Sequence, residues 1–292
     1  MRHLGLLLLC ATVLGFAPGR ARAEINGADS IEWATIDADL VVRGHVVNVA
    51  ASKAKDSPGW YVVTLSVAET LKGKAQKRVT FLTPQLGNEA PDEWRAKDRE
   101  LLLFLVRGSR RAVDDKRYAS ATWAPRHSNF GDKPFYFLND KTLSPAFASD
   151  FSVVSDRNVL QATIRNAAKS NATKVHKVDL PFESPAFTAL YGGSSVWLYV
   201  PADAALEARA LTWLASKDLG LREEGVKALG NFPSPANITR LKALLDDSAY
   251  ATITTSDKPT VRRFLVRALA DEVLNTWAVP HRHPVIDITT AR

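Results

Sequence analysis

The chain of 292 residues contains a single cysteine, Cys10, which lies within the first 23 positions. Disulfide bonds, thiolate metal ligands and a cysteine nucleophile are therefore excluded from residues 24–292. This part of the chain also lacks any apolar run approaching the roughly 20 residues that a membrane-spanning helix needs. Its stability must therefore come from a hydrophobic core, and about 269 residues are enough for two domains.

Sequence motifs of the common enzyme classes are missing as well. The chain has no G-x-S-x-G nucleophile elbow, no P-loop, no G-x-G-x-x-G and no H-E-x-x-H. We therefore predict no catalytic residue and no cofactor. A Ser–His–Asp triad assembled from distant positions is the alternative, because triads are recognised by geometry rather than by sequence order. Its candidate histidines are His45, His127 and His176.

Two further groups of residues are weighed as chemical sites. His281 and His283 share one face of an extended segment, but no carboxylate or cysteine is spaced along the sequence to complete a metal site with them. We therefore predict no metal and place this pair on the surface. The adjacent carboxylates Asp92-Glu93 and Glu223-Glu224 fit solvated helix faces better than acid–base pairs.

The first 23 residues have the pattern of a secretory signal peptide. A short polar start at Arg2 and His3 precedes an apolar run of about 13 residues, and Ala21-Arg22-Ala23 supplies small residues for cleavage. We expect cleavage near Ala23 and a secreted or periplasmic protein. Removing this segment leaves 35 basic against 31 acidic residues. Such a small excess favours weak contact with anionic surfaces and gives no support to nucleic-acid binding.

Residues 40–106 have the pattern of short strands. Trp60 to Ala68 alternates, so that Tyr61, Val63, Leu65 and Val67 share one face. Leu101 to Val106 is continuously apolar, as in a strand that is buried on both faces. Further strands are predicted at residues 40–49 and 79–82, with a weaker candidate at 117–123. Short strands separated by turns predict a small barrel or sandwich.

The segments ADLVVRGHVVNV, VTLSVAETLKGK, VTFLTP and LLLFLV follow one another between Ala38 and Arg107. In this order they resemble the exported OB-like barrels related to netrin and metalloprotease-inhibitor domains. The resemblance implies an OB-like β-barrel. Inhibitors of that family chelate the protease zinc through an amino-terminal cysteine, which residues 24–292 do not have. The resemblance therefore implies the fold and not the inhibition.

Two features of this β region are candidate binding sites. A basic cluster follows the apolar strand and is a candidate loop for an anionic ligand, with an ordinary solvated hairpin as the alternative. Its members are Arg107, Arg110, Arg111, Lys116 and Arg117. Four tryptophans form either an aromatic patch or, as we expect for most of them, part of the core. They are Trp33, Trp60, Trp94 and Trp123.

The carboxyl end contains an internal repeat. Leu221–Leu229 aligns with Val261–Leu269 at an offset of 40 residues, with Val226 opposite Val266. Helical spacing at this period is typical of HEAT repeats. Helices are also predicted at residues 204–216 and 235–245. Because at most two helical pairs are present, and about three are usually needed for stability, the array should pack against the β region or the middle segment.

These patterns predict an α+β protein with a small OB-like β-barrel and a carboxy-terminal HEAT-like α-helical region. The expected units are a signal peptide at 1–23, the barrel at 24–148, a mixed connecting segment at 149–200 and the helical region at 201–292. Within the connecting segment we expect a helix at 155–169, capped by Ser155, an extended stretch at 180–184 and a strand at 196–200. We expect an exported, non-enzymatic binding or scaffold protein that docks a protein or peptide partner. The alternatives are an exported hydrolase and a binder of anionic envelope polysaccharide.

Overall fold

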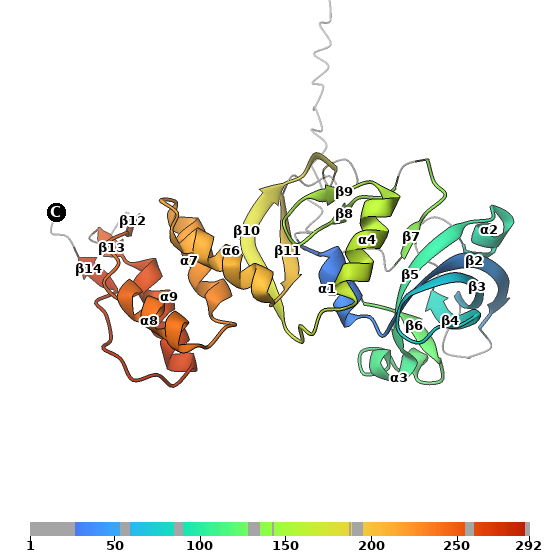
Figure 1. The fold of residues 1–292 in the computed structure, drawn as a ribbon, viewed down its shortest axis with the longest axis horizontal. Coiled ribbons are helices and arrows are strands. Elements are labelled where there is room, and N and C mark those ends of the chain that lie inside the picture. Colours follow the sequence, from blue (N-terminus) through green and yellow to red (C-terminus); the bar gives the residue numbers. More distant parts are fainter. Residues whose placement is uncertain are drawn as a thin grey trace, which may run out of the picture.

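The computed structural model describes residues 27–52, 59–84, 90–127, 135–141, 143–186, 188, 195–254 and 260–289. The predicted signal peptide lies outside the described residues. The fold is α+β, and Figure 1 shows a β-barrel at one end, helices α6 to α9 at the other, and a second sheet between them. No helix among the described residues is both long and apolar enough to cross a bilayer.

Five strands close the predicted barrel. They are β2 (Leu40–Ala51), β3 (Trp60–Lys72), β4 (Arg78–Pro84), β5 (Glu100–Arg107) and β6 (Trp123–Pro125). The strand order is β2-β3-β4-β6-β5, and the ring closes because β2 also pairs with β5. Strand β4 runs parallel to β6, and β7 (Phe135–Phe137) pairs with the first half of β5, along the edge whose second half pairs with β6. The strand candidate at 117–123 is wrong, since η1 (Lys116–Tyr118) is a 3-10 turn capped by Asp115 and the strand begins only at Trp123.

The barrel interior follows the predicted alternation. Val63 and Leu65 of β3 are fully buried, and Tyr61 and Val67 pack against the same core. Strand β5 is buried on both faces, because alternate residues enter the barrel core while the others meet α1 (Ile31–Asp37), α4 (Arg157–Ala167) and neighbouring loops. All four tryptophans named above are buried, which confirms the core prediction. Helix α4 is capped by Asp156 rather than Ser155, since the Asp156 side chain accepts from the amides of the first turn.

A second sheet joins the two ends of the molecule. It consists of β1 (Gly27–Asp29), β10 (Val175–Glu183) and β11 (Ser195–Pro201), in the order β1-β11-β10. Although β1 precedes the barrel strands in the chain, it pairs with β11 and therefore does not belong to the barrel. Arg126, which follows β6, donates to Asp29 at 2.7 Å and to Asp37 at 2.6 Å. This buried ion pair connects the barrel to the second sheet.

Four helices follow the second sheet and share one core with it, as the shortness of the helical array led us to expect. They are α6 (Ala204–Leu214), α7 (Leu219–Leu229), α8 (Pro235–Leu244) and α9 (Leu265–Thr276). Val226 and Val266, which the repeat aligns, are both fully buried. The first residues of the second copy are not helical, however, because Val261–Arg263 forms strand β13.

The remaining elements are short. A terminal sheet contains β12 (Ala251–Ile253), β13 and β14 (Asp287–Thr289), and Figure 1 shows it at the end of the molecule farthest from the barrel. The others are α2 (Pro91–Ala96), α3 (Gly108–Arg111), β8 (Ala146–Phe147) and β9 (Val153–Val154).

Candidate functional site

Two arginines of the basic cluster predicted after β5 pair with acids of the chain itself. Arg110 donates to the backbone oxygen of Asp37 at 2.6 Å and pairs with the Asp37 carboxylate. Arg111 pairs with Asp114 at 3.0 Å. These two arginines therefore serve different acids within the chain.

The other members of the cluster contact acidic or aromatic side chains or are exposed. Arg117 pairs with Asp115 at 2.7 Å and stacks on the Trp60 ring. The Arg107 guanidinium lies 4.1 Å from the centre of the Trp123 ring, and Lys116 is exposed at the start of η1. The three arginines at 110, 111 and 117 are thus already neutralised by neighbouring carboxylates, which weakens the case for a polyanion site.

His176 forms a buried polar cluster between β10 and α7. Its Nε2 donates to Glu224 at 2.8 Å, its Nδ1 accepts from the Asn231 amide at 3.2 Å, and Glu224 also accepts from the Asp179 backbone N–H. The expectation that Glu224 lies on a solvated helix face is wrong, because its side chain is 1% exposed. Both ring nitrogens of His176 are occupied, so this cluster holds the helix to the sheet and leaves no nitrogen for a serine nucleophile.

The remaining triad candidates lie on the surface. His45 Nδ1 is 3.0 Å from the Asp98 carboxylate, and both side chains are exposed. His127 is exposed and follows the barrel strand β6. Within the described residues the acid beside His45 is itself exposed, whereas the acid that orients a catalytic imidazole is buried.

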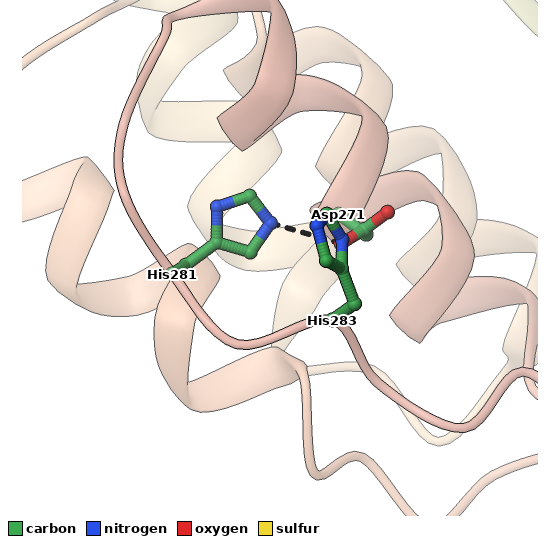
Figure 2. A group of neighbouring side chains, drawn as sticks. All are labelled: Asp271, His281 and His283. Carbon is green, nitrogen blue, oxygen red and sulfur yellow. Dashed lines mark hydrogen bonds and ion pairs between the residues drawn. The ribbon is translucent and has the colours of Figure 1, made fainter.

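A cluster of three side chains forms where the chain turns back along α9. His281 Nε2 lies 2.9 Å, and His283 Nδ1 2.8 Å, from the same Asp271 oxygen. The three ligand atoms lie within 4.8 Å of one another. Figure 2 shows both rings converging on Asp271 from the segment that follows the helix. We call these residues the His–Asp cluster.

The cluster is fixed on its inner side and open on its outer side. The His281 side chain is 3% exposed and its Nδ1 donates to the Val279 carbonyl at 2.7 Å, whereas the His283 side chain is 73% exposed. The hydrogen bond to Val279, and then the one to Asp271, raise the pKa of His281. Burial acts to raise the pKa of Asp271, but the hydrogen bonds from the two histidines outweigh it and lower that pKa.

The sequence-based prediction at this position was wrong in two respects, the first being that the His281 side chain is 3% exposed and does not lie on the surface. We expected no carboxylate to complete a site with His281 and His283, yet Asp271 lies against both. Asp271 is ten residues before His281 in the sequence and on a different element. The sequence feature that could have indicated this is the amphipathic pattern of α9, which places Asp271 at the border of the buried face of the helix.

The segment of residues 279–286, here called the return segment, connects this cluster to the terminal sheet. It is also held by the Arg267 side chain, which donates to the Val285 oxygen at 3.1 Å, and by the Phe264 amide, which donates to the Ile286 oxygen at 2.9 Å. It leads directly into β14, which pairs with β13 in antiparallel register.

The terminal sheet gathers exposed apolar side chains. Among the described residues nine large hydrophobic side chains are exposed, and four of them lie in this sheet or beside it: Tyr250, Ile253, Val285 and Ile288. Within the described part of the chain β14 pairs with β13 alone, so its other edge is open. Because Phe264 and Ile286 form a hydrogen-bonded pair, the alternation of the ladder directs the backbone groups of Asp287 toward that open edge.

Comparison with known proteins gives no relative. The chain matches no protein-family model, and neither the search of curated proteins nor the search of solved structures found a match. Functional assignment therefore depends on the residues and their geometry.

Proposed function

We propose that this protein is an exported, non-enzymatic binding module that docks a partner protein at its terminal sheet. The observation that carries the proposal is the open edge of β14 together with the exposed apolar side chains around it. Exposed sheet edges are templates for strand addition.

The chemistry of the surface selects the kind of partner. Arg263 is paired with Asp287 at 2.9 Å, whereas the exposed Arg262 lies over the Tyr250 ring, on the same face as Ile288. This face combines apolar area with a positive charge. The partner that fits it is an extended peptide segment in which apolar residues alternate with a carboxylate that meets Arg262.

The barrel and the helical region each resemble a fold that supports a binding role. We infer that the barrel is OB-like, since its strand order β2-β3-β4-β6-β5 closes a five-stranded ring and α2 lies between β4 and β5. We infer that α6 to α9 are HEAT-like, based on two successive helical pairs and the buried valines at 226 and 266. Both architectures commonly serve recognition.

Export is part of the proposal. The first 23 residues supply the signal peptide, so the protein recovered from the periplasm or the medium should begin at Glu24. Intact-mass measurement of the recovered protein tests this step separately from the docking surface. A recovered chain that still carries residues 1–23 would contradict it.

Docking is tested by selecting a phage-displayed library of random linear peptides on the full mature chain. We expect selected peptides that alternate apolar and acidic residues. Asp287→Pro removes the backbone N–H at the open edge. Because one hydrogen bond to the peptide is lost and the proline ring clashes with the added strand, binding should weaken about ten-fold.

The matched control is Asp287→Ala, which loses the ion pair to Arg263 but keeps the backbone N–H. It should bind the selected peptides within about two-fold of the wild type, because an exposed ion pair contributes little. Selection of no specific peptide, or equal binding by Asp287→Pro and wild type, would reject the docking surface.

A further inference from the structure

The His–Asp cluster has the donor set of a transition-metal site. It offers two imidazole nitrogens and one carboxylate oxygen, drawn from α9 and the return segment. We propose that Asp271, His281 and His283 bind one zinc ion, with a water molecule as the fourth ligand. This proposal is independent of peptide docking at the terminal sheet.

The spacing of the three atoms suits an ion. Zinc bonds to nitrogen and oxygen of about 2.0–2.1 Å, arranged as a tetrahedron, place neighbouring ligand atoms roughly 3.3 Å apart. The two nitrogens lie 2.9 and 2.8 Å from the Asp271 oxygen, so each needs to move only about 0.5 Å away from that oxygen, and all three ligand atoms already lie within 4.8 Å of one another. The exposed His283 side chain has the freedom to make this movement.

The inner histidine is oriented for coordination. Because His281 Nδ1 donates to the Val279 carbonyl, the neutral ring carries its lone pair on Nε2, which faces Asp271. A backbone carbonyl holding the distal N–H is the usual support of a metal-bound histidine. Zinc would bind Nε2 on the side that faces Asp271.

The donor types select the class of ion. Magnesium and calcium prefer sets made of oxygen atoms, whereas imidazole favours zinc and its first-row neighbours. The positive charge of Lys242 acts on His281 and opposes any cation here. The carboxylate of Asp271 offsets that charge at shorter range. Three protein donors leave one position open on the solvent side, where His283 is exposed.

Bound zinc would fasten the return segment to α9. Asp271 lies within the helix, while the two histidines lie a few residues before β14. An ion shared among them therefore holds the strand that forms the open edge of the terminal sheet.

Zinc chloride titrated calorimetrically into the full mature chain, prepared without a histidine tag and treated with chelator, tests the site. We expect one zinc per chain. His283→Ala and Asp271→Asn should each weaken the affinity at least about ten-fold, as loss of a ligand does. Because His283 is exposed, its replacement leaves the fold intact, which circular dichroism verifies.

The matched control is His45→Ala. His45 lies 3.0 Å from Asp98, a similar distance, but this pair offers only two donors. Its replacement should leave the zinc affinity unchanged. The absence of zinc binding by the wild type, or binding by His283→Ala and Asp271→Asn equal to the wild type, would overturn the proposal.

Discussion

Arg126 provides the sharpest test of how the two ends of this molecule are held together. Its side chain is 5% exposed and donates to Asp29, which is 1% exposed, and to Asp37. Burial lowers the pKa of Arg126, but the two aspartates outweigh burial and raise it. Arg126→Leu keeps the apolar part of the side chain and leaves two carboxylates without their shared cation.

The expected loss of stability follows from the burial of this ion pair. Removing one partner of a buried ion pair costs about 3–5 kcal/mol, because the remaining charge stays desolvated. Arg110→Leu is the matched control, since Arg110 pairs with the same Asp37 but is 48% exposed. That change should cost roughly 0–1 kcal/mol. The free energy of unfolding from urea titration at pH 7, monitored by tryptophan fluorescence, measures both values.

A second variant separates stranded charge from lost packing. Adding Asp29→Asn to Arg126→Leu neutralises the more deeply buried carboxylate, so part of the lost stability should return. If Arg126→Leu costs no more than Arg110→Leu, or if Asp29→Asn restores nothing, the connection between barrel and second sheet does not rest on this ion pair.

Three further predictions concern stability, each measured as the free energy of unfolding or the melting temperature. Glu224→Ala should lower the free energy of unfolding by about 1–3 kcal/mol for each buried donor that it leaves without an acceptor. Glu223→Ala should change it by no more than about 0.5 kcal/mol. Hydrogen bonds from two arginines lower the pKa of Glu69, so its stabilisation is complete above its usual value of 4.5 and is lost as the pH falls below it. Glu69→Gln should therefore reduce the fall of the melting temperature as the pH is lowered. Gly44→Ala should cost at least about 1–3 kcal/mol, because a Cβ there would collide with the Ser66 carbonyl oxygen.

The barrel was the part of the fold most accessible from sequence. Its strands carry the period-two alternation of Tyr61 to Val67 and the continuous apolar run of β5, and each pattern is set by local burial. The helices were accessible for the same reason, since α6 to α8 begin at capping aspartates or at Ser234. Periodicity and caps are properties of a single element.

What sequence reasoning missed are contacts between elements. The repeat alignment predicts helix at residues 261–263, but these residues pair with both β12 and β14, and that tertiary pairing overrides the local pattern. Glu224 looked like a surface residue until β10 placed His176 against it. Asp271 could not be linked to His281 and His283 because the link depends on how the return segment folds along α9.

The distribution of charge explains why the terminal sheet, and not the barrel, is the stronger candidate for recognition. Around the barrel, Arg110, Arg111 and Arg117 already have carboxylate partners within the chain, so an anionic ligand would have to displace them. At the other end, Ile288 and Arg262 share an exposed face beside an open strand edge. A partner that adds to β14 would gain hydrogen bonds and apolar contact while the Arg263–Asp287 ion pair stays in place, and this lower cost is the reason that our proposal places docking at the terminal sheet.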